Sequence, residues 1–288
     1  LLDLVALGTV ADVAQLRGLN RAFVAQGLKV MAARRNIGLS ALIQASRLTR
    51  APICSDLGFA LGPRINAGGR VGKSDLGVRL LTTEDAAEAQ EIALELDRLN
   101  EERRAIESVV QEQAEAMLAG QHNRAVALLS GEGWHPGVVG IVAARLKEAT
   151  NRPAVVIGLD GNEGKGSGRS VAGVDLGASI QRLATEGLLL KGGGHRMAAG
   201  LSLTRDQLEP AMARLAELLA KQGAGSTGPA DLRLDGLLMP KAATPELVAD
   251  LERAGPYGQG APAPRFAFPD VAVSFAKNLS DKHLKVTF

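Results

Sequence analysis

The sequence contains a single cysteine, Cys54, so no internal disulfide can form, and no zinc-ligand spacing surrounds it. No run of about 18 apolar residues occurs, so we expect no membrane span. Thirty-three lysines and arginines nearly balance 31 aspartates and glutamates, which leaves a formal charge of +2. These absences exclude a disulfide-rich secreted domain and a polybasic nucleic-acid binder. We expect a cytoplasmic protein whose DNA affinity, if any, comes from charges clustered in a groove.

The chain has ample apolar content to bury a core. It has 288 residues, of which 46% are hydrophobic and 22% charged. At roughly 100–200 residues per domain, this length predicts one large or two to three small domains. The sequence opens at Leu1 without a methionine and ends at Phe288 inside a strand-like run. We therefore expect both ends to be truncated, so that a missing targeting segment proves little.

The first segment, Leu1 to Val10, is an almost continuous apolar run that closes at Ala11-Asp12. Such a run is typical of a strand buried on both faces of a parallel sheet. Ligands of open α/β sheets bind where strands end, so Asp12 could offer an oxygen ligand to Mn²⁺ or Mg²⁺. Alternatively, Asp12 only caps the following segment. Asp3 could support a metal site or serve as a structural hydrogen-bond partner.

Residues 84–118 contain neither glycine nor proline and predict one long helix. Thr83 is the expected N-cap, and the helix would run roughly 50 Å at about 1.5 Å per residue. Arg103 and Gln113 interrupt its apolar stripe. We expect this helix to connect two domains. The stripe consists of Ile92, Leu96, Leu99, Ile106, Val110 and Met117.

After residue 120 the pattern changes to short alternating elements that predict an α/β domain. The predicted strands are 126–129, 154–157 and 201–203, and the predicted helices are 138–148, 176–184 and 208–219. The composition of Gly223–Pro229 is that of a flexible linker. Beyond it, 232–238 and 271–275 predict strands of an all-β module.

Three glycine-rich segments can bring backbone N–H groups close to a phosphate. In the predicted loop 58–77, Arg64 and Arg70 could bind its oxygens, or could be solvated arginines of a surface loop. Segment 164–170 could form a phosphate nest with Ser167, Arg169 and Ser170 as donors, or be a flexible turn.

The third segment is 191–200, where three glycines precede His195. The imidazole could approach a ligand closely, or be a satisfied structural residue. Trp134 could stack on a base, although core packing is the stronger expectation. His135, which directly precedes a predicted helix, could support the fold or a ligand.

Five motifs follow one another along the sequence: Asp-Leu-Val-Ala-Leu-Gly-Thr-Val-Ala-Asp (3–12), Gly-Pro-Arg-Ile-Asn-Ala-Gly-Gly-Arg (62–70), Gly-Trp-His-Pro-Gly-Val-Val-Gly-Ile-Val-Ala (133–143), Gly-Ser-Gly-Arg-Ser (166–170) and Gly-Gly-Gly-His-Arg-Met-Ala-Ala-Gly (192–200). Taken together and in this order, they resemble the RecJ exonucleases of the DHH phosphoesterase superfamily. Segments 254–266 and 283–288 resemble the start of that family's oligonucleotide-binding (OB) barrel.

The resemblance implies an α/β architecture in four parts. Residues 1–80 would end a DHH parallel-sheet catalytic domain, 81–119 would be the connecting helix, 120–222 a DHH-associated domain and 229–288 a partial OB-fold. Gly68 departs from the alanine expected in its motif, which leaves the assignment intact. The family's Asp-x-Asp pair and Asp-His-His signature do not occur in the sequence.

The resemblance also implies roles for particular residues. Asp12 would be a metal ligand and catalytic, and Arg169 and His195 would act at the phosphate as catalytic residues. Two Mn²⁺ or Mg²⁺ ions are expected in the intact enzyme, and Asp12 alone cannot hold both. The residues expected to bind substrate are Arg64, Asn66, Arg70, Ser167, Ser170 and Gly194.

The implied activity is 5′–3′ hydrolysis of single-stranded DNA to mononucleotides in repair and recombination. We expect this fragment alone to be inactive. The expected partners are single-stranded DNA and possible helper proteins, namely a helicase and a single-strand-binding protein. One alternative is a DHH phosphodiesterase acting on oligoribonucleotides or cyclic dinucleotides, against which the OB-like tail argues. The other is a non-catalytic DNA-binding scaffold, against which the intact Arg64, Arg169 and His195 argue.

Overall fold

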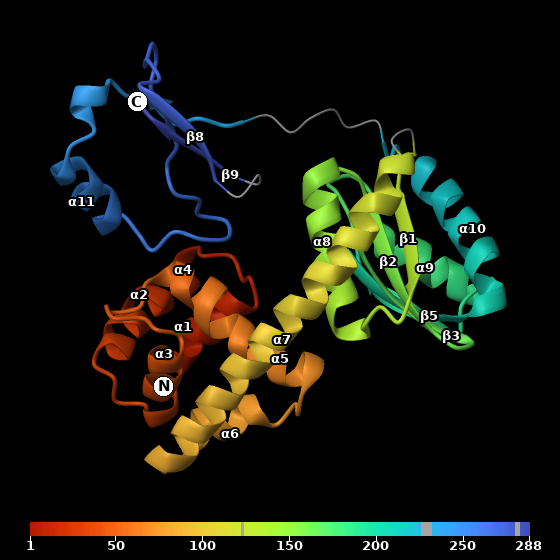
Figure 1. Ribbon diagram of the computed structural model, residues 1–288, viewed down its shortest axis with the longest axis horizontal. Helices are drawn as coiled ribbons and strands as arrows, with labels where there is room; N and C mark the ends of the chain where they lie inside the picture. Colours follow the sequence, from red (N-terminus) through yellow and green to blue (C-terminus); the bar gives the residue numbers. More distant parts are fainter. Residues whose placement is uncertain (122–123, 226–231, 280–282) are drawn as a thin grey trace. The chain divides into compact units, whose positions relative to one another are not determined.

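The computed structural model describes residues 1–121, 124–225, 232–279 and 283–288 (Figure 1). The chain folds into two compact units with a mixed α/β architecture. Unit 1 consists of Leu1–Gly62 and Asp231–Phe288, and unit 2 consists of Pro63–Ala230. Within the described ranges, no helix is long and apolar enough to cross a membrane.

The N-terminal part of unit 1 is helical, so the strand predicted over residues 1–10 is wrong. A continuous apolar run of this length has no hydrophobic periodicity, so its pattern cannot distinguish a strand from a buried helix. The first two helices pack closely, because a Cβ on Gly27 would lie 2.5 Å from the Cβ of Ala6. In order, the elements are α1 (Leu2–Ala11), α2 (Gly18–Ala32), α3 (Ile37–Ala45), α4 (Cys54–Asp56) and a π-helix (Leu57–Leu61).

The C-terminal part of unit 1 contains short paired strands and one helix. β6 and β7 pair in parallel, and β8 and β9 form an antiparallel pair. Strands were predicted over 232–238 and 271–275, but only the ends of these segments are in strands. The linker predicted at Gly223–Pro229 lies partly outside the described residues. The elements are β6 (Gly236–Leu237), α11 (Pro245–Arg253), β7 (Phe266–Ala267), β8 (Phe275–Leu279) and β9 (His283–Thr287).

The segment after α11 packs on the helices of the same unit. The backbone N–H of Leu16 donates to the carbonyl of Gln259 at 2.7 Å, and Nε of Arg17 donates to the carbonyl of Gly260 at 3.2 Å. A Cβ on Gly258 would lie 2.7 Å from Cδ1 of Leu16. These contacts join the two stretches of sequence that make up unit 1.

In unit 2 the glycine-rich segment predicted as a loop over 58–77 is mostly helical. It contributes most of the π-helix, all of α5 (Gly62–Val71) and the start of α6 (Leu76–Thr82). Gly68 and Gly72 are four residues apart and face the long helix α7 (Ala86–Leu118), because a Cβ on them would lie 3.2 Å from Leu96 and 2.6 Å from Leu99. Glycines can therefore mark close helix packing as well as a loop.

The long helix predicted over residues 84–118 is confirmed as α7 (Ala86–Leu118). Its N-cap is Asp85 rather than Thr83, because Oδ1 of Asp85 accepts from the N–H groups of Ala87 and Glu88 at 2.7 and 3.2 Å. Thr83 instead donates to Oε2 of Glu88 at 2.6 Å.

The rest of unit 2 is built on a five-stranded sheet with the order β1-β2-β3-β5-β4. β1 and β2 are parallel and the other pairs are antiparallel. The strands predicted over 126–129, 154–157 and 201–203 and the helices that follow them are confirmed. The strands are β1 (Ala127–Glu132), β2 (Ala154–Asp160), β3 (Glu163–Arg169), β4 (Lys191–His195) and β5 (Ala198–Thr204), and the helices are α8 (Pro136–Thr150), α9 (Leu176–Thr185) and α10 (Leu208–Ala220).

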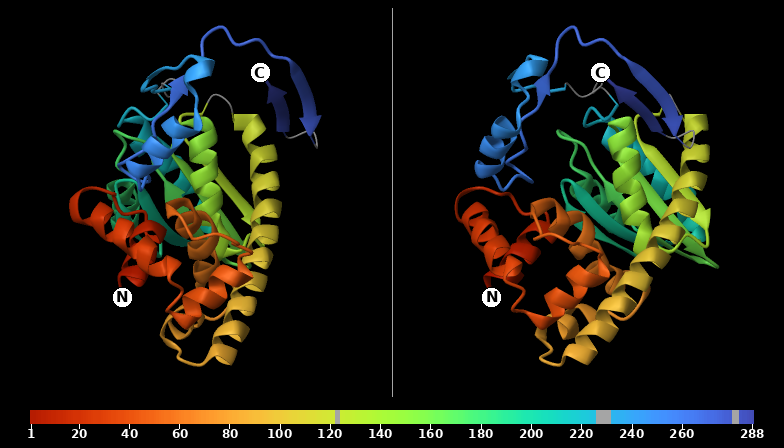
Figure 2. Two further views of the ribbon diagram at one scale, coloured as in Figure 1. Left: turned by 90° about the vertical axis from the view of Figure 1, so that its left-hand side faces the viewer. Right: turned by 60° about the vertical axis from the view of Figure 1, so that its left-hand side comes forward.

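Each face of this sheet is covered by a different pair of helices (Figures 1 and 2). On one side α7 and α8 form a core with β1 and β2 that includes Val110, Val138 and Val156. On the other side α9 and α10 form a core that includes Ile157, Ile180 and Leu215. Because successive residues of a strand point to opposite faces of the sheet, the register shows which side chains of β3 and β5 share a face.

The glycines of β3 face the α9 side, where space is short. A Cβ on Gly164, Gly166 or Gly168 would lie 2.7–2.8 Å from Leu203, Ile157 and Leu176 respectively. The segment is therefore a regular strand, so the phosphate nest and the flexible turn predicted for its backbone are both wrong, whereas the role predicted for its side chains at a phosphate stays a prediction. Its remaining residues, Glu163, Lys165, Ser167 and Arg169, face the α8 side.

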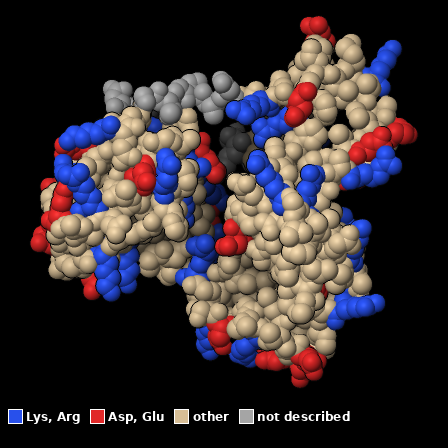
Figure 3. Space-filling model, turned by 180° about the vertical axis from the view of Figure 1, so that it is seen from behind, with Lys and Arg blue, Asp and Glu red and all other residues tan. Residues whose placement is uncertain are grey.

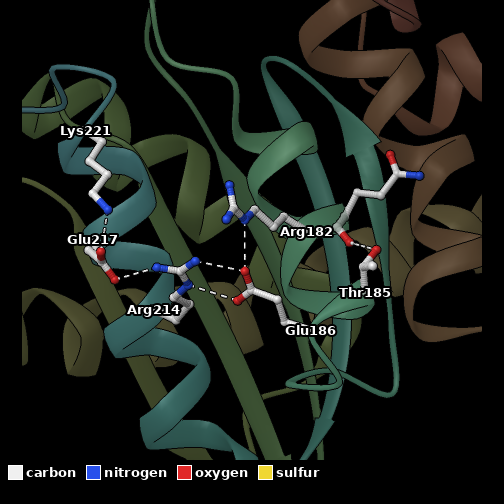
Figure 4. A network of polar contacts seen from close by, with 7 residues as sticks. Arg182, Thr185, Glu186, Arg214, Glu217 and Lys221 are labelled. Atoms are coloured by element: carbon white, nitrogen blue, oxygen red, sulfur yellow. Dashed lines mark hydrogen bonds and ion pairs between the residues drawn. The ribbon is translucent and has the colours of Figure 1, made fainter.

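An ion-pair network joins α9 to α10 (Figure 4). Oε1 and Oε2 of Glu186 accept from NH2 and Nε of Arg214, both at 2.9 Å, and Oε1 also accepts from Nε of Arg182 at 2.9 Å. NH1 of Arg214 also donates to Glu217 at 2.7 Å. These contacts, those of Arg214 first, lower the pKa of Glu186 from 4.5 to about 2.

A lowered folded-state pKa predicts how stability depends on pH. The Glu186 contribution is fully present above its unfolded pKa and is lost as the pH falls toward the folded value. We expect Glu186→Gln to lower the urea midpoint at pH 7, and the gap to the wild type to narrow between pH 4.5 and pH 2. Glu101→Gln on α7, which is exposed, serves as the control. A gap that does not change with pH would contradict the assigned role.

Candidate phosphate-binding site

Arg169 lies at the end of β3 on the α8 side of the sheet and is half-buried. NH1 of its guanidinium donates to Oγ of Ser167 at 2.8 Å and to the carbonyl of Gly168 at 2.9 Å. Both acceptors are neutral, and no carboxylate among the residues described pairs with Arg169. A cation in this setting retains its capacity to bind an anion.

A glycine of α8 allows Arg169 and Ser167 to approach that helix. A Cβ on Gly140 would lie 3.0 Å from Oγ of Ser167 and 3.1 Å from NH2 of Arg169. Glycine is unfavourable inside a helix, so the Gly-Val-Val-Gly motif signals a close approach of this kind. Sequence reasoning did not use that signal, and Gly140 was missed.

Arg70 brings a second cation to the same place. It lies near the end of α5, and its NH1 donates to the carbonyl of Gly137 at 2.9 Å, in the first turn of α8. Burial lowers the pKa of Arg169, and the nearby charge of Arg70 lowers it further. The two cations therefore repel each other, and an anion bound between them would relieve that repulsion.

The start of α8 is fixed by His135, whose Nδ1 accepts from the N–H of Gly137 at 3.0 Å. Of the two roles left open for His135, the structure supports the structural one. Trp134 is buried, and its Nε1 donates to Oε1 of Gln113 on α7 at 2.6 Å. Core packing is therefore the role of Trp134, and Gln113 interrupts the apolar stripe of α7 because it is the partner of that indole.

A buried carboxylate, Glu107, joins α7 to α8. It pairs with Arg103 at 2.5 Å and with Arg145, and its side chain is only 3% exposed. Burial lowers the pKa of Arg103, Glu107 opposes that shift, and the charge of Arg70 adds to it. Arg103 and Arg145 therefore have an anionic partner in Glu107. Arg169 has none among the described residues.

Three of the expected substrate-binding residues lie elsewhere or are occupied. Nε of Arg64 pairs with Oδ1 of Asp97 on α7 at 2.8 Å, and both side chains are largely buried. Asn66 is exposed on α5. Ser170 is buried and donates its hydroxyl proton to the carbonyl of Val174 at 2.8 Å. Since a serine has one proton to donate, Ser170 closes a turn rather than offering a phosphate donor.

His195 and Gly194 end the edge strand β4. The His195 side chain is exposed, and in the sheet His195 is opposite Ala198, which is itself opposite Arg169. Gly194 is required by packing, because a Cβ there would lie 2.4 Å from the carbonyl oxygen of Ala198. The register thus places Arg169 and His195 in one row across the sheet.

Asp12, the expected metal ligand, belongs to unit 1 and is exposed at the C-terminal end of α1. Asp3 is buried, and its Oδ1 accepts from the N–H of Leu4 at 3.0 Å. Across the described parts of the chain, no group of three or more His, Cys, Asp or Glu side chains could hold a metal ion. The described residues therefore do not by themselves form a two-metal centre.

Two family models match segments of the chain. Residues 122–221 match the DHHA1 domain model and residues 234–288 match the RecJ OB domain model. The single-stranded-DNA-specific exonuclease RecJ of Dickeya dadantii is 43% identical over 282 residues, covering 92% of this chain and 48% of the relative. Its Escherichia coli counterpart is 40% identical over 296 residues, covering 99% of this chain and 51% of the relative.

A solved structure extends the match to the fold. The crystal structure of RecJ from Thermus thermophilus in complex with Mn²⁺ superposes with a TM-score of 0.82 at 34% identity, covering 99% of this chain and 42% of that one. The chain belongs to the RecJ family. It spans about half the length of the curated RecJ relatives named above.

The five-stranded sheet of unit 2 lies within the segment that matches the DHHA1 domain. Arg169, Ser167 and His195 all lie within the segment that matches the DHHA1 domain. Asp12 and Arg70 lie outside both matched segments. A second RecJ crystal structure, bound to manganese, superposes with a TM-score of 0.64 at 38% identity and covers 76% of this chain.

Proposed function

We propose that the chain forms the phosphate-holding part of a nuclease that hydrolyses single-stranded DNA from its 5′ end to mononucleotides, in DNA repair and recombination. The proposal rests on Arg169, which is half-buried beside Arg70 and, among the described residues, bonded only to neutral groups. The RecJ relatives, whose names specify single-stranded DNA, support the choice of substrate.

Arg169 would bind the substrate phosphate through its planar fork, and Arg70 would add charge beside it. The Ser167 hydroxyl orients Arg169 and can donate to the same phosphate. His195, at the other end of the same row, would donate to a phosphate oxygen as charge builds on it during hydrolysis. Arg64 and Ser170 take structural roles in this proposal.

The domain division that we propose places 1–80 in the catalytic domain, 81–119 in the connecting helix, 120–222 in the DHH-associated domain and 229–288 in the OB-fold. The two matched family segments and the length of α7 support this division. Asp12 would contribute one ligand to Mn²⁺ or Mg²⁺, the ions named for RecJ crystal structures from Thermus thermophilus. The other ligands would have to come from outside this chain.

The missing ligands predict that this chain by itself does not cut DNA. We expect no mononucleotide release when it is incubated with 5′-labelled single-stranded DNA and Mn²⁺, because one carboxylate cannot hold two ions. Thin-layer separation of the labelled products measures this directly. Metal-dependent release that disappears in Asp12→Ala would show that the metal site is complete.

The chain should nevertheless bind phosphate through Arg169. We expect Arg169→Lys to weaken binding of single-stranded DNA about tenfold, close to 1.4 kcal/mol, because a point charge cannot replace a bidentate fork. The magnitude of the slope of log affinity against log salt should fall by less than the roughly 0.7 expected for the loss of one charge contact, because lysine keeps the positive charge. His195→Ala should change affinity less than Arg169→Lys, because its contact strengthens mainly during hydrolysis.

Fluorescence anisotropy over a salt series measures both quantities. Arg98→Lys on α7 is the control, because that arginine is exposed and already paired with Glu95 and Glu102. Wild-type affinity in Arg169→Lys would place the phosphate elsewhere.

A further inference from the structure

On the α8 side of the sheet, Gly200 of β5 and Lys191, Gly193 and His195 of β4 are exposed, beyond the strands on which α7 and α8 pack. The register aligns the residues of this face in rows across three strands. One row is Arg169–Ala198–His195, the next is Ser167–Gly200–Gly193 and the third is Lys165–Ser202–Lys191. The first row belongs to the proposed phosphate site, and the third row has no role there.

The middle row forms a floor without bulky side chains. Gly200 and Gly193 are both exposed. A Cβ on Gly200 would meet only the carbonyl oxygen of Gly166, at 3.9 Å, and a Cβ on Gly193 would meet nothing within 4 Å. These two glycines are therefore not required by packing, unlike Gly192 and Gly194, whose Cβ atoms would clash with neighbours. They leave space above the sheet.

Cationic or imidazole side chains stand at the four corners of this floor. Neighbouring strands lie about 4.8 Å apart and residues advance about 3.4 Å along a strand. The two ends of one row are thus roughly 10 Å apart, and the two outer rows are roughly 14 Å apart. Lys165 and Lys191 are exposed, and no ion pair of either is found among the residues described. The flexible lysine stems can reach toward the floor.

Acidic side chains mark the end of the floor. Moving along β3 away from Arg169, Glu163 is the next residue after Lys165 on the same side of the strand. Its register partner Asp160 is also exposed. Carboxylates at this end would repel a strand of phosphates that ran further. In Figure 3, basic and acidic side chains both occur on the visible surface of each unit.

We propose that this face is a nucleotide cradle, in which Lys165 and Lys191 bind a second phosphate of the strand whose first phosphate lies on the row of Arg169 and His195. The nucleoside between the two phosphates lies over Gly200 and Gly193, where no side chain obstructs it. The cradle rests on the proposed function, and it adds a binding site for the neighbouring nucleotide of the same DNA strand.

The double variant Lys165→Gln/Lys191→Gln separates the cradle from the first phosphate site. We expect it to weaken binding of a 5′-phosphorylated thymidine pentanucleotide about tenfold and to reduce the salt slope by about 0.7. Binding of thymidine 5′-monophosphate should stay within twofold of the wild type, because one phosphate occupies only the row of Arg169. The control is Lys221→Gln, which lies just after α10 on the other side of the sheet.

Filling the floor offers a second test without changing charge. Gly200→Phe should place its ring above the sheet and abolish pentanucleotide binding, whereas Gly200→Ala should have little effect. The thermal midpoint of both variants should be no lower than that of the wild type, because the added Cβ meets open space and strands favour side chains over glycine.

The outcomes distinguish the cradle from the function on which it rests. If the double lysine variant and Gly200→Phe bind the pentanucleotide as the wild type does while Arg169→Lys weakens it, the cradle is wrong and the proposed function stands. If Arg169→Lys also binds normally, both fail. Equal weakening of the pentanucleotide and the mononucleotide by the lysine variant would also contradict a separate second phosphate site.

Discussion

Crowding on one face of the β3 strand determines what its other face can present. Gly164, Gly166 and Gly168 have no space for a Cβ, because Leu203, Ile157 and Leu176 fill the α9 side. That packing fixes the register of β3 against β2 and β5, and a slip of one residue would turn every side chain to the opposite face. Lys165, Ser167 and Arg169 therefore point to the α8 side as a consequence of core packing.

The charges near α8 leave two cations, Arg169 and Arg70, without a carboxylate partner among the described residues. Glu107 neutralises part of the charge of Arg103 and Arg145 and holds α7 against α8. Arg70 bonds to a carbonyl at the start of α8, and Arg169 bonds to a hydroxyl and a carbonyl. A buried ion pair is costly to break, so the paired arginines are poor candidates for a ligand contact. Arg169, in contrast, can bind an anion without giving up a carboxylate.

The sequence predicted the elements whose pattern is strictly periodic. The long helix α7 and the strand–helix alternation of unit 2 were found because their apolar residues repeat at helical or strand spacing over many positions. The strand predicted over 1–10 was wrong because an apolar run of ten residues suits a buried helix as well. The glycine-rich segments were misjudged because glycine is as compatible with close packing as with a turn, and only the fold shows what each one faces.

Arg169 and His195 were singled out from the sequence as residues of the candidate site, but their arrangement in space was not predicted. Arg169 and His195 share a row because β5 lies between β3 and β4, a strand order that no local pattern specifies. Arg64 was expected at the phosphate, and Asp97, thirty-three residues further along, holds it instead. Ser170 directly follows Arg169 in sequence, yet its hydroxyl faces the turn at Val174. Contacts between residues far apart in the chain decide such cases.

The central claim is that Arg169 holds a substrate phosphate on the open side of the sheet. Side-chain NMR of the Nε–H groups of ¹⁵N-labelled arginine, during titration with thymidine 5′-monophosphate, tests it most directly. We predict a saturable shift of the Arg169 signal, with backbone shifts at Ser167 and Gly200 and none at Arg98. A titration in which Arg169 does not move, or in which exposed arginines move equally, would contradict the account.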